Sequence, residues 1–335
     1  MQTILLVVLM FAILIFPHEL GHFIAARLCG VQVNEFSFGM GPALYKKQGK
    51  RTLYSIRLFP IGGYCAMEGE DTEEADDNPA AFNNQPWWQK IFILVAGAAM
   101  NILIAFVLFV GLSVFLGTVT TGIGEVMGGS PAARAGLQTG DVIQAVEGQE
   151  TPEWSDVTRI LQEEAKEGRA LTLTVEREGV RMDFPVQPEK NQEGIFAIGI
   201  KARVVHHLGT ALMNGARSTG ESIRLIFSSL KSLFTSKDAL KQVSGPVGIV
   251  KVVHKTAAYG WLYYLYLLAL ISINLAVFNI LPLPALDGGR VIFVIIRLFT
   301  GKAISDKVEA RVHTVGFILL LGLAVAVTYN DILNW

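Results

Sequence analysis

The sequence predicts a polytopic α-helical membrane protein with four spanning helices and one α+β domain inserted outside the membrane. Of the 335 residues, 51% are hydrophobic and only 17% are charged, and the mean hydropathy is +0.43. Four stretches contain the ~20 mostly apolar residues that a helix needs to cross a bilayer. Between the second and third stretches lies a more polar segment, long enough for a separate domain.

The four predicted spans are residues 2–28, 91–116, 262–283 and 312–329. Amphipathic rings prefer the membrane interface, and aromatic residues flank these spans: Trp87, Trp88, Trp261, Tyr263, Tyr264, Tyr329 and Trp335. We divide the chain into a first transmembrane helix (1–30), a loop with a reentrant β-sheet (31–86), a second transmembrane helix (87–117), the inserted domain (118–203), an amphipathic juxtamembrane region (204–260), a third transmembrane helix (261–298), a short loop (299–311), and a fourth transmembrane helix with the C-terminus (312–335).

Charge and cysteine content exclude several kinds of partner and site. The formal net charge is −1, and no basic block is present, so we expect no nucleic-acid partner. Cys29 and Cys65 are the only cysteines, and they do not form a C-x-x-C pair, which argues against a disulfide framework or a cysteine zinc site. The first residues lack a positive segment and a cleavage site, so we expect a retained span.

Basic residues predict the orientation in the membrane. The two short loops contain Lys46, Lys47, Lys50, Arg51, Arg57 and Lys90, and Arg290, Arg297, Lys302, Lys307 and Arg311. The two chain ends contain no lysine or arginine. Because short cytoplasmic loops are enriched in basic residues, we expect both loops in the cytoplasm. Both termini and the inserted domain then lie outside the cell membrane.

A metal motif, His18-Glu19-Leu20-Gly21-His22, lies inside the first span. On a helix, His18 and His22 lie one turn apart and can reach one metal ion, while Glu19 is placed to take a proton from water. Ionisable groups in a membrane span are costly and mark functional sites. A chance match inside an apolar span is therefore disfavoured.

The loop after the first span has strand character. Residues 33–39 and 52–59 are rich in aliphatic and aromatic side chains, which is typical of strands. We expect a small sheet that folds back toward the membrane beside the metal. Its predicted exposed edge is Phe36, Ser37, Phe38, Gly39, Met40 and Gly41. Residues 68–77 are expected to form an acidic, exposed tail of this loop.

The inserted domain has specific turn chemistry. Ser130-Pro131 begins a short helix, Gly136 ends it, and Gly140-Asp141 leads into a strand at residues 142–146. A helix at 154–165 and strands at 171–177 and 181–186 follow. This order and the S-P-A-x-x-A-G-L-x-x-G-D signal resemble a PDZ domain.

Apolar residues at spacings of three and four predict an amphipathic helix after this domain. They are Ile223, Ile226, Phe227, Leu230, Leu233 and Phe234. Two interpretations stay open: the helix lies on the outer membrane surface, or it packs against the inserted domain.

A third protein ligand is expected because a catalytic zinc usually has three. Asp287, in Asn279-Ile280-Leu281-Pro282-Leu283-Pro284-Ala285-Leu286-Asp287-Gly288-Gly289, ends the third span at the depth of His18. Pro282 and Pro284 break the helix, and irregular backbone is tolerated where it lines a buried site. The competing interpretation is that Asp287 only caps the next helix. His313 is interpreted as a packed or interfacial residue in preference to a functional one, and Asn101 is equally well a helix-packing or a functional residue. His206, His207 and His254 receive no role.

Together these motifs resemble the site-2 protease family of intramembrane zinc metalloproteases, in its bacterial form with a single PDZ domain. The resemblance covers essentially the whole chain. It implies a Zn²⁺ ion on His18, His22 and Asp287, with Glu19 as the catalytic base. It also implies a reentrant β-loop at residues 36–41 and substrate-holding roles for Asn279 and Asn274. The segment from Gly97 to Asn101 departs from the family's G-P-x-x-N because Ala98 replaces proline, and Tyr64-Cys65-Ala66-Met67 departs from the commoner Y-V-K-M.

The expected function is therefore endoproteolysis inside the membrane, in regulated intramembrane proteolysis. By resemblance, the substrates are single-span membrane proteins already cut outside, such as an anti-sigma factor, or remnant signal peptides. A peptide or protein C-terminus is a candidate ligand of the PDZ domain, and the lipid bilayer is the other partner. Two other functions are weighed: a divalent-metal transporter, which would leave Glu19 without a role and shows no repeat, and a catalytically inactive PDZ scaffold, although every catalytic position is filled.

The orientation is testable by cysteine labelling in intact cells. With Cys29 and Cys65 replaced by serine, Gln149→Cys in the inserted domain should react with a membrane-impermeant maleimide. Lys47→Cys should react only after permeabilisation, because the basic loop is expected in the cytoplasm. Labelling of Lys47→Cys with protection of Gln149→Cys would overturn this topology.

Overall fold

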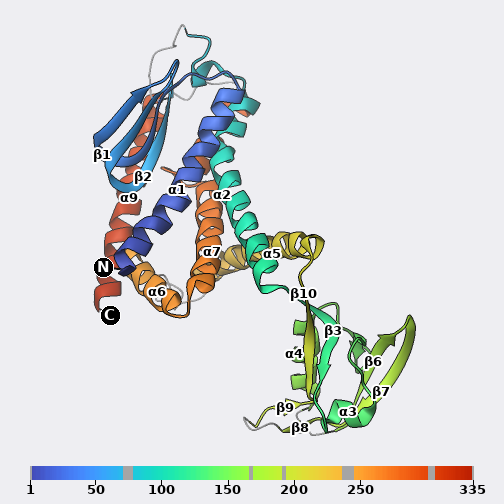
Figure 1. The fold of residues 1–335 in the computed structure, drawn as a ribbon. Helices are drawn as coiled ribbons and strands as arrows, with labels where there is room; N and C mark the ends of the chain where they lie inside the picture. Colours follow the sequence, from blue (N-terminus) through green and yellow to red (C-terminus); the bar gives the residue numbers. More distant parts are fainter. Residues whose placement is uncertain are drawn as a thin grey trace. The chain divides into compact units, whose positions relative to one another are not determined.

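The structure is a computed structural model that describes residues 2–70, 78–165, 169–190, 194–235, 245–300 and 306–333. Most of the predicted acidic tail at 68–77 lies outside the described residues, as does much of the short loop at 299–311. The chain divides into two compact units, one formed by Met1–Leu112 with Gly215–Trp335 and the other by Ser113–Asn214. Each is described by itself (Figure 1).

Within the described residues, four helices are long and apolar enough to cross a membrane, as the sequence predicted. They are α1 (Gln2–Leu28), α2 (Trp87–Leu116), α7 (Trp261–Ile280) and α9 (Asp306–Leu333). Three shorter elements accompany them: the 3₁₀ turn η1 (Phe82–Asn84), α6 (Pro246–Ala258) and α8 (Asp287–Thr300). Side chains from α1, α6 and α7 form one buried cluster around Met10, Leu14, Val253, Tyr264 and Leu268.

The predicted amphipathic segment lies in a long helix, α5 (Leu208–Thr235). Ile223, Ile226 and Leu230 pack against a buried cluster contributed by α2 and α7, which includes Phe109 and Ile273. These side chains of α5 therefore cover spanning helices, a contact that neither interpretation of the sequence included. Phe227, by contrast, is exposed. The side chains of Leu233 and Phe234 lie outside the described residues.

The loop after α1 forms a sheet from two bent strands, β1 (Val33–Gln48) and β2 (Leu53–Met67). The first half of β1 pairs on one side with residues 53–56 and on the other with residues 63–67, while residues 43–48 pair with 53–57. Both strands bend at glycines with positive φ, at Gly39 and Gly41 in β1 and at Gly62 in β2. Each strand thus contributes two segments, and across the sheet their order is 43–48, 53–57, 33–38 and 63–67.

This pairing corrects the predicted sheet edge. Residues 36–38 are paired on both sides, so their backbone donors and acceptors are used within the sheet. The prediction of an open edge there is wrong, because the strands are longer than residue type alone indicated and double back. Within the described part of the chain, residues 63–67 of β2 pair only with β1 and form an outer edge.

The second unit is built on a sheet with strand order β10-β3-β4-β6-β7, with β5 paired to β4. Its elements are β3 (Thr118–Val126), α3 (Pro131–Ala135), β4 (Val142–Val146), β5 (Gln149–Glu150), α4 (Trp154–Glu164), β6 (Leu171–Arg177), β7 (Val180–Val186), β8 (Glu189–Lys190), β9 (Phe196–Ala197) and β10 (Ile200–Val205). Ser130 caps α3 through the amide of Ala133, and Gly136 ends it with φ of 88°, as the turn chemistry predicted.

An ion pair secures the turn into β4. Arg177 Nε donates to Asp141 Oδ1 over 2.7 Å, and the Gln138 amide donates to Asp141 Oδ2 over 2.8 Å. Burial by itself would raise the pKa of the Asp141 carboxyl, but these hydrogen bonds outweigh it and the pKa lies below its usual value. Since Asp141 is buried, this turn is held by a charged, fully bonded side chain.

Candidate metal centre

The helix α1 brings the two motif histidines to one face. His18 and His22 are 8% and 7% exposed, and their Nε2 atoms lie 3.2 Å apart. Four residues make slightly more than one helical turn, so both rings project in the same direction. Pro17, directly before His18, lies inside the helix and removes one backbone donor at this point.

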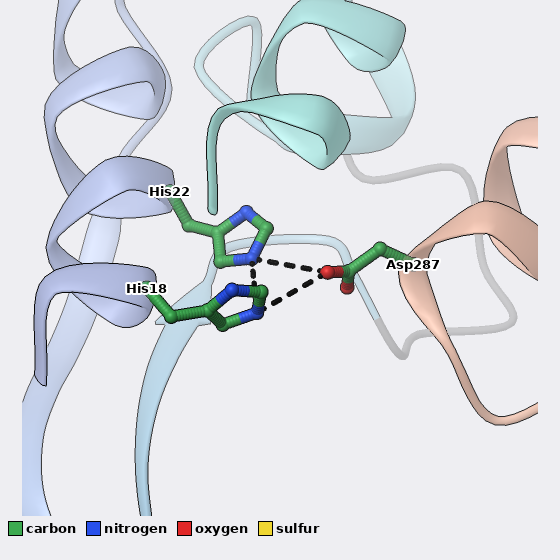
Figure 2. Close-up of side chains that lie close together, drawn as sticks. All are labelled: His18, His22 and Asp287. Carbon is green, nitrogen blue, oxygen red and sulfur yellow. Dashed lines mark hydrogen bonds and ion pairs between the residues drawn. The ribbon is translucent and has the colours of Figure 1, made fainter. Parts of the chain in front are cut away.

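Asp287 lies close to the two histidines in space, although it follows them by more than 260 residues in the sequence. It is the first residue of α8, after a turn that follows α7. Its Oδ2 lies 3.3 Å from His18 Nε2 and 3.4 Å from His22 Nε2 (Figure 2). Gly288 makes this approach possible, because a Cβ there would lie 2.2 Å from the carbonyl oxygen of Ile280.

The chemistry of these donors fits a bound cation. His22 Nδ1 lies 2.8 Å from the Ile93 carbonyl oxygen; we assign it the proton, which leaves a bare lone pair on Nε2. Asp287 Oδ2 is buried and has no hydrogen-bond partner among the described residues. Three electron-pair donors facing one another would repel without a cation. Around a tetrahedral ion with bonds of about 2.0–2.1 Å, ligand atoms are about 3.3–3.4 Å apart, close to the spacing here.

Glu19 lies beside this set and not within it. The three clustered donors are His18, His22 and Asp287, while Glu19 lines the same cleft, of about 650 Å³. A Cβ on Gly63 of β2 would lie 3.3 Å from Glu19 Cγ, so this side chain runs beside the strand. A carboxylate next to a metal site can exchange a proton with a water in the cleft.

The other predicted site residues differ in their placement. Asn279 Nδ2 lies 3.4 Å from His18 Nε2, so the structure brings this amide to the metal ligands. Asn274 is exposed on α7 and lies five residues, or roughly 140° around a helix, from Asn279. Phe36 and Ser37 are buried, Phe38 is half-buried, and all three are paired on both sides within the β1–β2 sheet. The remaining three, Gly39, Met40 and Gly41, form the bend of β1.

Sequence reasoning did not assign two residues that the structure brings to the site. A Cβ on Gly97 of α2 would lie 2.2 Å from His22 Nε2 and 2.8 Å from His18 Cε1. His313 Nδ1 lies 2.8 Å from the Ala285 nitrogen, next to the turn that carries Asp287. Gly97 lies in a run of small residues, and His313 is a polar residue in an apolar helix. Neither residue indicates a functional role from the sequence alone, because that role depends on which residues lie beside it in space.

Comparison with known proteins gives a match over most of the chain. The sequence profile of peptidase family M50 matches residues 6–323. A Clostridium acetobutylicum protein provisionally named a zinc metalloprotease is 36% identical, over 98% of this chain and 97% of its own length. The regulator of sigma-W protease RasP of Bacillus subtilis is 28% identical, over 99% and 98%.

Among solved structures, the chain is similar to two PDZ domains of SdrC-like proteins. The domain from Listeria monocytogenes is 17% identical, covers 25% of this chain and 88% of its own, and has a TM-score of 0.23. The domain from Listeria innocua is 20% identical, covers 26% and 99%, and has the same TM-score of 0.23. The family assignment rests on the sequence matches.

The close approach of Gly97 predicts that a single methyl group disturbs the metal centre. In Gly97→Ala, the added carbon must displace the rings of His22 and His18, and we expect Zn²⁺ affinity to fall by about 10–100-fold, as for other changes that misplace metal ligands. Equilibrium competition with a chromophoric chelator on the detergent-purified protein measures this.

Gly111→Ala is the matched control, because Gly111 lies on the same helix and a Cβ there meets nothing within 4 Å. Both substitutions raise helix propensity equally. Equal Zn²⁺ affinities of the two variants would show that Gly97 does not make room for the ligands.

Proposed function

The chain belongs to peptidase family M50, and from this premise we propose that His18, His22 and Asp287 hold the zinc ion of an intramembrane endoprotease. The observation that carries the proposal is the convergence of three buried donor atoms at 3.2, 3.3 and 3.4 Å. These residues come from α1 and α8, more than 260 positions apart, so nothing in local chain geometry requires them to meet. A site for passing ions, or a scaffold with a degenerate site, would not need Glu19 beside them.

The residues of this chain supply the remaining chemistry. A zinc ion bound here polarises the scissile carbonyl and acidifies water. Glu19 takes a proton from the attacking water and later gives it to the leaving amine, and its place in the same cleft supports this role. Asn279, whose amide nitrogen is 3.4 Å from His18 Nε2, donates a hydrogen bond to the substrate carbonyl as it becomes negative.

Substrate is held as an added β-strand, on an edge other than the one first expected. A helix hides its peptide bonds, and unwinding it in lipid leaves backbone groups without partners. The outer edge at residues 63–67 of β2 offers such partners. Tyr64, Cys65, Ala66 and Met67 line the same cleft as His18 and Glu19, so a strand added here passes the metal.

The names of the relatives and the charge pattern support an assignment of substrate class and orientation. The Bacillus subtilis relative has the name regulator of sigma-W protease RasP. We assign this chain single-span substrates such as anti-sigma factors or remnant signal peptides, already cut outside the membrane. The basic short loops place the site on the cytoplasmic side. The Ser113–Asn214 unit is then an extracytoplasmic domain, and its capped α3 and strand order support a PDZ-type fold. We assign this domain the role of excluding substrates that still carry a folded outer domain.

Glu19→Gln tests the catalytic assignment. We expect Zn²⁺ binding to be retained and cleavage of a helical substrate in detergent to fall by about 10²–10⁴-fold, because the substitution removes a proton acceptor but no ligand. His18→Ala should lose both zinc and activity. Normal cleavage by Glu19→Gln, or zinc retention by His18→Ala, would contradict the assignments.

The substrate edge is tested by photo-crosslinking in the Glu19→Gln protein, which traps substrate uncut. A benzoylphenylalanine at Tyr64, on the outer segment of β2, should crosslink to the substrate span because an added strand lies alongside it. The same group at Tyr54, on a segment paired on both sides, is the matched control. Stronger crosslinking from Tyr54 than from Tyr64 would show that substrate does not bind at this edge.

A further inference from the structure

The turn that carries Asp287 contains an unusual backbone conformation. Ala285, two residues before Asp287, has a φ of 71°. The left-handed region is uncommon for residues with a Cβ, because the Cβ crowds the following carbonyl oxygen. In the described residues of the first unit, every other positive φ belongs to a glycine. Such a conformation persists only where its surroundings hold it, so some contact must hold Ala285.

That contact comes from α9. The Ala285 amide donates to His313 Nδ1 over 2.8 Å, so Nδ1 carries the lone pair and Nε2 the proton. The His313 ring also lies against α8, with its centroid 5.6 Å from that of Phe293. One side chain therefore touches both the turn before Asp287 and the helix that Asp287 begins.

The backbone packs closely around the His313 ring, at the contact between α9 and the turn before Asp287. A Cβ on Gly316, almost one helical turn after His313, would lie 2.3 Å from Pro284 Cβ, and one on Gly289 would lie 2.3 Å from the Leu283 carbonyl oxygen and 3.3 Å from His313 Cε1. The turn and α9 are thus in contact at backbone distance. Yet α9 is otherwise the least buried of the four spanning helices, with 6% of its most apolar window buried.

We propose that His313 is a positioning residue for the zinc ligand Asp287. It accepts the Ala285 hydrogen bond, holds Ala285 in the left-handed conformation, and so sets the direction in which the Asp287 carboxylate leaves α8. The proposal rests on the assignment of Asp287 as a ligand. Supporting groups that orient ligands usually change metal affinity by about 10–100-fold when they are removed.

The alternative role is packing, and two substitutions of similar size separate the roles. His313→Leu fills the space but cannot accept a hydrogen bond. His313→Asn keeps an acceptor, because the Asn side-chain oxygen occupies nearly the place of Nδ1. If His313 acts through its hydrogen bond, Leu is defective and Asn rescues. If it acts only by packing, Leu is tolerated at least as well as Asn.

The experiment is a Zn²⁺ titration of the full chain in detergent against a chromophoric chelator, with thermal unfolding followed in parallel. We expect His313→Leu to raise the zinc dissociation constant by about 10–100-fold, and His313→Asn to remain close to the unchanged protein. Val315→Leu, at an exposed position on another face of α9, is the control and should not change zinc affinity.

A double-mutant cycle with Ala285→Gly keeps the result decisive if His313→Leu is unstable. Glycine adopts positive φ without strain, so the zinc affinity lost through His313→Leu should be smaller when residue 285 is glycine. Equal losses in both backgrounds, or unchanged zinc affinity in His313→Leu, would overturn the positioning role. Asp287→Ala in the same titration separates the positioning role of His313 from the ligand role of Asp287. If Asp287→Ala also keeps zinc, the proposed ligand set itself is wrong.

Discussion

The convergence of three bare electron-pair donors inside a membrane protein is the constraint on which the rest of this structure depends. His18, His22 and Asp287 are brought within 4.8 Å of one another, where the lone pairs repel and water is scarce. A bound cation would remove that repulsion, provided that each donor is prevented from turning away. Much of the surrounding structure can be understood as supplying those restraints.

The restraints come from backbone as much as from side chains. The carbonyl of Ile93 bonds to His22 Nδ1 over 2.8 Å, which fixes both the ring and its tautomer. Glycines allow the helices to approach: a Cβ on Gly21 would lie 2.3 Å from the Ala96 carbonyl oxygen. Small residues at helix contacts are the usual means of close packing in membranes. Here they bring α2 against the ligand face of α1.

A second constraint comes from the substrate, whose peptide bonds are protected while it is a helix. In the proposed binding mode, residues 63–67, one outer segment of the β1–β2 sheet, lie along the cleft and offer backbone groups to an unwound substrate. An open edge is ordinarily a liability for aggregation. Its place in the same cleft as Glu19 makes the edge part of the proposed active site.

The sequence by itself determined the four spans, the two halves of the candidate metal site and the caps of α3. Each of these depends on residue type at short spacing: twenty apolar residues, histidines four apart, or a serine and a glycine at the ends of a helix. Only the tertiary structure decided which strand segment is the free edge, what the face of α5 covers, and that Gly97 and His313 adjoin the ligands. Those outcomes depend on contacts between segments far apart in the chain, where one residue of register or one methyl group changes the neighbour. A local sequence pattern does not determine the contacts between segments that are far apart in the chain.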